Sequence, residues 1–334
     1  VPSPVDKITS PTRLERWAVC PHRHLVEDIL RAAPVENPED NLMITALDKG
    51  SLVHAALEAF LLRVLAREPG ARPGFGDAWT AVDRALLHEI GSALCDQYEA
   101  RGLVGRPIFW TRDRRQILRD LDHALMLDSA HRVTHGTKPI AAELAFGFAG
   151  EALDAVEIAL PDGRVLQVRG RIDRVDEGAD GTIHVVDYKT GSLRGGYKDL
   201  AEDNPVVGGT KLQLPLYGLA GRMAAHRADA AVRADYWFAT AKGGFKRAGY
   251  TVTPGVLETT IEVLDVIVRG VEAGVFPPRP DPLSTFLWVD CHTCDPDGLG
   301  TAELRKQWER KRHDPALQEY AELAEPVEPV EVDL

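Results

Sequence analysis

The spacing of apolar residues changes from helical to strand-like near residue 135. Before that point, apolar positions recur every three or four residues, which is the period of an amphipathic helix. Ser10 and Pro11 carry the cap and first-turn signals of a helix start. Helices are predicted over residues 11–20, 51–65, 76–100 and 111–133. The first 135 residues are therefore expected to be mostly helical.

Beyond residue 135 the apolar positions alternate with polar ones, which is typical of strands. Strands are predicted over residues 139–148, 164–176, 182–190 and 232–240, with an edge strand after the turn at 241–250. The turns at 161–163 and 177–181 are rich in Gly and Asp and fit hairpins. Helices are predicted over residues 211–226, 258–274 and 301–313. The pattern indicates a mixed α/β chain.

Composition narrows the class of protein. The chain has 334 residues, 44% of them hydrophobic, and a net charge of −12. No apolar run approaches the roughly 18 residues that a membrane span needs, so no membrane contact is expected. The overall acidity predicts that any nucleic-acid contact comes from local basic patches. Because the chain starts at Val1 rather than at Met, we expect a piece of a larger protein.

Two carboxylates and a lysine form the most informative pattern. Asp187 and Lys189 alternate in one predicted strand and therefore point to the same face. A short hairpin joins this strand to the one that carries Asp173, which brings the two acids together. Converging carboxylates repel unless a cation lies between them, and hard oxygen ligands favour Mg²⁺ or Mn²⁺. Two acids, a lysine and such a cation are the minimal set for phosphodiester hydrolysis.

These motifs resemble the PD-(D/E)XK nuclease superfamily. The segments GRIDRVD and VVDYKTG, followed by QLPLY, match its core in the branch of RecB-type and AddB-type nucleases and CRISPR-associated adaptation exonucleases. GSLVHAALEAF and TSPTRLERWAVCPHRH match further elements of that branch in the expected order. The resemblance implies a restriction-endonuclease-like mixed sheet flanked by helices, with a helical N-terminal insertion and a cysteine clamp that joins the termini.

The resemblance also implies roles for individual residues. His54, Asp173, Asp187 and the backbone carbonyl of Tyr188 are the implied metal ligands, and Lys189 is the implied catalytic lysine. Further implied catalytic residues are Gln213 and Tyr217, four apart on a helix, and Glu143, where some members place an additional acid. For Glu143, an exposed strand position stays an equal alternative.

Cysteine usage is sparse, which predicts a reducing, cytoplasmic compartment rather than a disulfide scaffold. The resemblance implies that Cys20, Cys291 and Cys294 hold a [4Fe–4S] iron–sulfur cluster, but the fourth cysteine of that pattern is absent. Three alternatives stay open: a cluster with a non-cysteine ligand, a structural Zn²⁺ site, and no metal. Candidate histidines for the fourth position are His22, His24 and His292. Cys95 is expected to be a buried small residue.

The implied activity is a DNA exonuclease or end-processing nuclease in repair, with single-stranded DNA or duplex ends as substrate. A helicase domain or subunit is an expected partner. The alternative is a nuclease-fold domain that binds DNA or a helicase without cutting. Candidate DNA contacts are Arg194, Lys198 and Lys211 after the active strand, and Arg112 and Arg115 near Trp110, whose ring suits base stacking.

The expected organisation has five parts. They are an N-terminal segment with Cys20 (1–45), a helical region with His54 (46–135), the nuclease core (136–280), a CxxC clamp with a terminal helix (281–313), and a disordered acidic tail (314–334).

Overall fold

A five-stranded mixed sheet forms the centre of the chain in a computed structural model that describes residues 2–33, 42–279, 293–294 and 302–325. In the described part, the strands follow the order β1-β4-β5-β6-β7. They are β1 (Thr137–Phe146), β4 (Gly170–Gly178), β5 (Ile183–Lys189), β6 (Val232–Phe238) and β7 (Arg247–Thr251). β5 and β6 are parallel, and the other neighbours are antiparallel.

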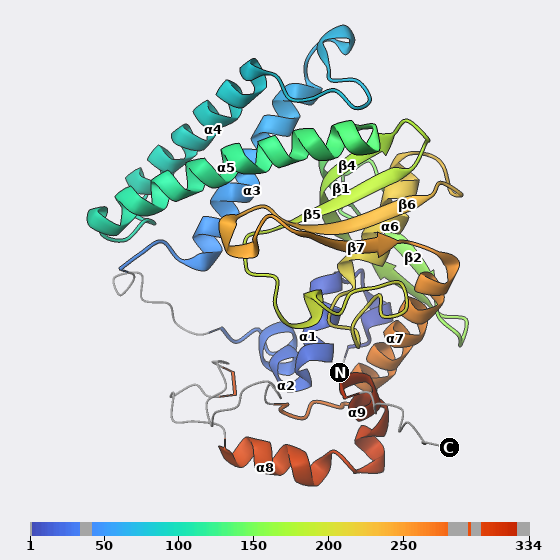
Figure 1. Cartoon of the computed structure of the whole chain (residues 1–334). Helices are drawn as coiled ribbons and strands as arrows, with labels where there is room; N and C mark the ends of the chain where they lie inside the picture. Colours follow the sequence, from blue (N-terminus) through green and yellow to red (C-terminus); the bar gives the residue numbers. More distant parts are fainter. Residues whose placement is uncertain (1, 34–41, 280–292, 295–301, 326–334) are drawn as a thin grey trace, which may run out of the picture.

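Three long helices cover one face of the sheet (Figure 1). They are α3 (Ala46–Leu65), α4 (Ala81–Ala100) and α5 (Pro107–His135). α5 ends where Gly136 adopts the left-handed conformation, with φ of 59°, and the chain passes directly into β1. Cys95 is completely buried in this helical layer, as predicted.

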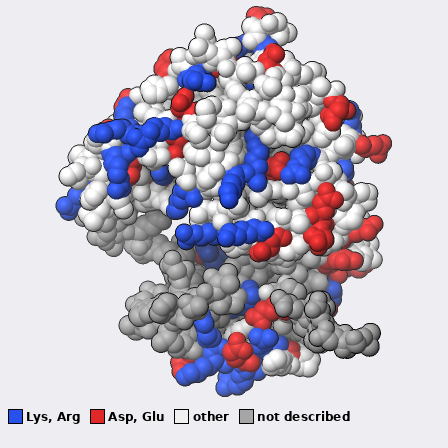
Figure 2. Space-filling model, in the orientation of Figure 1, with Lys and Arg blue, Asp and Glu red and all other residues white. Residues whose placement is uncertain are grey.

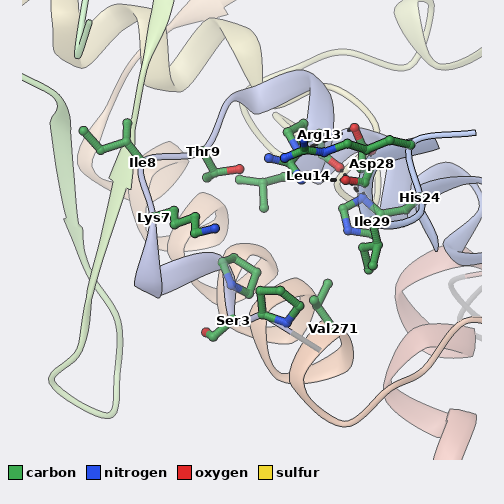
Figure 3. Close-up of a pocket in the computed structure, with 13 residues that line it drawn as sticks. Ser3, Lys7, Ile8, Thr9, Arg13, Leu14, His24, Asp28, Ile29 and Val271 are labelled. Carbon is green, nitrogen blue, oxygen red and sulfur yellow. Dashed lines mark hydrogen bonds and ion pairs between the residues drawn. The ribbon is translucent and has the colours of Figure 1, made fainter. Parts of the chain in front are cut away.

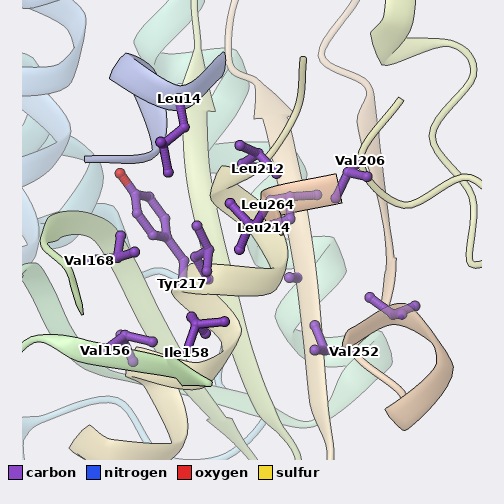
Figure 4. Packing of buried hydrophobic residues seen from close by; sticks show 14 of the residues in the cluster. Leu14, Val156, Ile158, Val168, Val206, Leu212, Leu214, Tyr217, Val252 and Leu264 are labelled. Atoms are coloured by element: carbon purple, nitrogen blue, oxygen red, sulfur yellow. The ribbon is translucent and has the colours of Figure 1, made fainter. Parts of the chain in front are cut away.

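The opposite face packs against a second set of elements. They are α1 (Pro11–Val19), α6 (Gln213–Ala224), α7 (Pro254–Glu272) and the small hairpin of β2 (Val156–Ala159) and β3 (Val165–Val168). Figure 4 shows side chains from these elements converging around Tyr217. The sheet is therefore buried on both faces, as the mixed α/β expectation requires.

Helices from near the two ends of the chain lie together below the sheet (Figure 1). They comprise α2 (Pro21–His24), which continues as a π-helical turn over Leu25–Ile29, α8 (Ala302–Lys311) and α9 (Gln318–Ala324). α9 corrects the predicted tail at 314–334, because residues 318–324 are helical. Tyr320 is 1% exposed and its ring meets Trp17 edge-on at 5.1 Å. The last nine residues of that prediction lie outside the described residues.

Several other predicted boundaries are also wrong, and two of them have a clear local cause. α3 begins at Ala46, five residues before the predicted start, because the hydroxyl of Thr45 accepts a hydrogen bond from the Asp48 amide at 3.0 Å. The predicted strand at 164–176 is two strands. The amide of Arg169 donates to the carbonyl of Thr9 at 2.8 Å, and this contact with the N-terminal segment separates β3 from β4.

Within the described residues, no helix combines the length and apolarity that crossing a membrane requires.

Candidate active site

The strand register brings three acids from three neighbouring strands together. Asp173 lies one position beyond the pair Arg174↔Val186, so it faces Asp187 where β4 and β5 part. On its other side, Asp173 lies between the β1–β4 pairs that flank Glu143. Glu143 has φ of 48°, outside the strand region, which interrupts the ladder at that point. The acids therefore gather where regular pairing stops.

Asp187 and Lys189 lie on the same side of β5 and form an ion pair. Asp187 is 4% exposed, and its Oδ2 atom has no hydrogen-bond partner among the described residues apart from this ion pair. Burial raises the pKa of Asp187, and repulsion by Asp173 adds to that rise against the attraction of Lys189. The pKa of Lys189 is raised despite its burial, because Asp187 stabilises the ammonium form.

Asp173 connects the sheet to α3. Its Oδ2 atom accepts a hydrogen bond from the Tyr188 amide at 2.6 Å and lies 3.5 Å from Nδ1 of His54. Burial lowers the pKa of His54, but Asp173 and Asp187 outweigh it, so the pKa is raised overall. α3 approaches closely here because Gly50 lacks a side chain, and a Cβ at that position would lie 3.1 Å from Oγ1 of Thr190.

Gln213 and Tyr217 occupy one face of α6, as their spacing predicts. The amide oxygen of Gln213 accepts a hydrogen bond from Nζ of Lys189 at 3.0 Å, and its nitrogen lies 3.5 Å from the Tyr217 hydroxyl. Gly170, at the start of β4, leaves room for the Tyr217 ring. The ammonium group of Lys189 therefore contacts both Asp187 and Gln213.

An open cleft of about 560 Å³ lies between α3 and the sheet, with His54, Asp173 and Glu143 on its walls. Two other charged residues there, Glu58 and Arg171, are missing from the residues that the sequence analysis selected. Glu58 follows His54 by one helical turn, and Arg171 precedes Asp173 by two strand positions. Both spacings were readable in the sequence.

The charged groups of this cleft change the pKa of Glu143. Its pKa is raised to about 7 by burial, by Asp173 and by Glu58, although Arg171 opposes the rise. Oε2 of Glu143 lies 3.7 Å from the Arg171 guanidinium. The structure therefore places Glu143 beside the other acids rather than at an isolated, exposed strand position.

A profile of the PD-(D/E)XK nuclease superfamily matches residues 8–297, which include the whole site and sheet. This chain belongs to the PD-(D/E)XK nuclease superfamily. The mixed sheet with helices on both faces agrees with the fold that the resemblance implied.

Curated relatives of this chain are named as one subunit of an ATP-dependent helicase/deoxyribonuclease. Those from Symbiobacterium thermophilum, Desulforamulus reducens and Desulforudis audaxviator are 34%, 28% and 30% identical over 64%, 62% and 64% of this chain. The matched region spans only 17% of each relative. A solved structure of SSO0001 is 16% identical over 68% of this chain and 94% of that one, with a TM-score of 0.24.

The donor chemistry of the site fits the hard cation that PD-(D/E)XK nucleases generally use. Asp173 and Asp187 offer carboxylate oxygens and His54 offers an imidazole nitrogen. Among the described residues, the buried Oδ2 atom of Asp187 has only Lys189 as a partner. In the described part of the chain, however, no three His, Cys, Asp or Glu side chains are grouped closely enough to hold an ion. The residues fit in kind, and their side chains would have to converge on binding.

The predicted cysteine clamp falls partly outside the described residues. Cys20 and Cys294 are both buried, whereas Cys291 and His292 lie outside the described residues. His24, one candidate fourth ligand, has its Nδ1 atom 3.0 Å from the Arg13 carbonyl and 3.1 Å from Asp28. Figure 3 shows Arg13, His24 and Asp28 converging at a cavity of about 150 Å³ beside α1. The clamp stays a prediction.

The predicted DNA contacts divide into exposed and occupied residues. Arg112, Arg115, Arg194 and Lys198 are exposed. Figure 2 shows basic side chains over the middle and the helical side of this face. Lys211 is half-buried, with its ammonium 4.3 Å from the centre of the Tyr197 ring.

Trp110 corrects the expected base-stacking platform beside Arg112 and Arg115. It is 3% exposed, and its ring nitrogen donates to Glu99 at 3.0 Å. A ring held in this way offers no face to a nucleic-acid base.

Proposed function

We propose that this chain is the nuclease domain of a helicase–nuclease and hydrolyses phosphodiester bonds of DNA with Mg²⁺ or Mn²⁺. The observation that carries the proposal is that Asp173, Asp187 and Lys189 lie near one another where β4 and β5 part. Acids forced together beside a lysine cost folding energy, and a DNA-binding surface gains nothing from them without a cation. The names of the curated relatives support the helicase–nuclease context and the DNA substrate.

His54, Asp173, Asp187 and the Tyr188 carbonyl would hold the cation. When bound, such a cation lowers the pKa of a water molecule and neutralises charge on the phosphate. The ammonium group of Lys189 would stabilise the negative charge that develops on the phosphate oxygens. Gln213 keeps that ammonium in place, and the Tyr188 amide orients Asp173.

Single-stranded DNA or a duplex end is the proposed substrate, cut as an exonuclease or in end processing. Exposed Arg112, Arg115, Arg194 and Lys198 would contact its phosphates, while Lys211 would act from a half-buried position. A helicase domain or subunit that supplies the strand is the proposed partner.

The decisive experiment compares wild type, Asp187→Ala and Lys189→Ala on labelled single-stranded DNA with Mn²⁺. We expect each variant to cleave at least about 100-fold more slowly, with DNA binding retained. Asp203→Ala, an exposed acid outside the cleft, is the matched control and should cleave normally. If wild type binds DNA but releases no more product than Asp187→Ala, the alternative of a binding domain without cleavage holds.

A structural metal at Cys20, Cys291 and Cys294 is a separate proposal, with an iron–sulfur cluster and Zn²⁺ as the alternatives. Metal analysis with a visible spectrum distinguishes them, because a cluster absorbs broadly in the visible range and Zn²⁺ does not. A protein purified without oxygen that contains neither metal would contradict the clamp.

A further inference from the structure

Glu15 of α1 caps a helix that begins almost 200 residues later. Its Oε1 atom accepts hydrogen bonds from the amides of Leu212 and Gln213 at 2.6 and 3.2 Å. The first amides of a helix lack partners within the helix, and a carboxylate is favoured at that positive end. Leu212, the N-cap residue of α6, has no side chain that could supply this cap.

The capped turn carries the residue that holds the catalytic lysine. Gln213 is the first residue of α6, and its side chain accepts from Nζ of Lys189 at 3.0 Å. Lys189 in turn pairs with Asp187. An unbroken series of contacts therefore runs from Glu15, through the backbone and side chain of Gln213, to the ammonium group at the site.

α1 is a rigid base for this contact. Figure 4 shows Leu14 next to the Tyr217 ring, with Leu212 close by. The ring nitrogen of Trp17 donates to the Val275 carbonyl at 2.9 Å, and Trp17 is fully buried. A residue held on a packed helix fixes its partner more closely than a loop residue does.

Placing the Glu15 carboxylate in this environment costs more free energy than a simple helix cap requires. Burial raises its pKa, opposed by the Leu212 amide and by the charges of Lys211 and Lys189. A serine or asparagine at position 212 would cap α6 locally without burying a charge. The chain instead uses a carboxylate that lies within the field of the catalytic lysine.

We propose that Glu15 is a positioning residue for the nuclease reaction, because it fixes the first turn of α6 so that Gln213 aims Lys189 at the phosphate. This inference rests on the proposed function. It assigns a role to α1, a helix from the opposite end of the chain, in the geometry of the active site.

The test compares Glu15→Ala and Glu15→Gln in the full chain, with single-turnover cleavage and DNA affinity measured separately. Glu15→Ala should slow cleavage about 10- to 100-fold, as displaced catalytic groups do, with affinity changed less than about twofold. Glu15→Gln keeps an acceptor oxygen and should recover most of the rate. In a Gln213→Ala background, Glu15→Ala should add little further loss, because both changes act through one contact series.

Thr253→Ala is the matched control. Thr253 caps α7, which carries none of the predicted site residues, by accepting from the Val256 amide at 3.3 Å. This variant should lower the melting temperature without changing the cleavage rate. If Glu15→Ala behaves in the same way, or if its effect adds fully to that of Gln213→Ala, the positioning role is overturned.

Amide hydrogen exchange separates this inference from the proposed function. Glu15→Ala should accelerate exchange at Leu212 and Gln213, whether or not the protein cleaves DNA. A wild-type protein that does not cleave DNA would overturn the proposed function. Unchanged amide exchange in Glu15→Ala would overturn the capping contact, whatever the cleavage result. If Glu15→Ala does not fold, Glu15→Asp, whose shorter side chain withdraws the acceptor oxygen from these amides, takes its place in the same comparisons.

Discussion

Replacing Glu143 by Gln should stabilise the metal-free protein while impairing its proposed activity. The carboxyl group lies beside Asp173 and Glu58, and burial and these charges raise its pKa from 4.5 to about 7. Between those pH values the folded state binds more protons at this position than the unfolded state does. The contribution of Glu143 to the free energy of unfolding is therefore fully present below about pH 4.5 and is lost as the pH rises through 7.

The size of the effect follows from the pKa. A rise from 4.5 to about 7 corresponds to about 3 kcal/mol at 1.36 kcal/mol per pH unit. Glu143 is partly solvated, so screening reduces the expected gain of Glu143→Gln to about 1–2 kcal/mol at pH 8. Near pH 4.5 the wild-type group is largely protonated, and the two proteins should be almost equally stable.

Urea unfolding in EDTA at pH 5, 6.5 and 8 measures this difference. Glu157→Gln, an exposed acid on β2, should stay within about 0.5 kcal/mol of wild type at each pH. A Glu143→Gln variant whose stability does not diverge from wild type as the pH rises would refute the repulsion argument. Added Mn²⁺ should then stabilise wild type more than the variant if Glu143 contributes to the cation site.

Three further changes test other parts of the fold and cleft. Asp128→Ala should destabilise the protein by about 3–5 kcal/mol in urea unfolding, because it leaves buried Arg174 and half-buried Arg247 without the acid they share. Exposed Asp122→Ala should cost under about 0.5 kcal/mol. Similar values for the two variants would contradict this argument. Arg171 is a cation inside an acidic cleft, so Arg171→Ala should raise KM for DNA about 10-fold or more with a smaller change in kcat. Exposed Arg84→Ala should leave KM unchanged. An unchanged KM in Arg171→Ala would exclude a role of Arg171 in DNA binding. Burial and nearby cations lower the pKa of His131 from 6.5 to about 3, so the contribution of neutral His131 to stability is lost as the pH falls below 6.5 toward 3. The melting temperature of His131→Gln should therefore fall less over that range than the melting temperature of wild type. Parallel curves for the two proteins would contradict this prediction.

Local periodicity explains which site residues the sequence could predict. The alternation of Asp187 and Lys189 fixes their shared side once β5 is a strand, and a short hairpin leaves few registers for Asp173. Gln213 and Tyr217 follow from helical spacing in the same way. Glu143 could not be decided locally, because its place at the site depends on the irregular backbone at φ of 48° opposite Asp173.

Contacts between distant segments explain what the sequence could not predict. The division of the strand at 164–176 depends on a hydrogen bond to Thr9, and the burial of Trp110 depends on a neighbouring helix. α9 is charged and short, yet Tyr320 packs against Trp17 of α1. No periodicity in one segment contains the information about its partner from the other end of the chain.

The same long-range packing explains how the acids of the site stay close together despite their repulsion. Three carboxylates, an interrupted ladder at Glu143 and a buried Asp187 oxygen each oppose folding, and they coincide where β4 and β5 part. The packed core on both faces of that sheet is what keeps them together. Under the proposed function, a bound cation would reduce their mutual repulsion, so the free energy that the site costs without metal would favour metal binding.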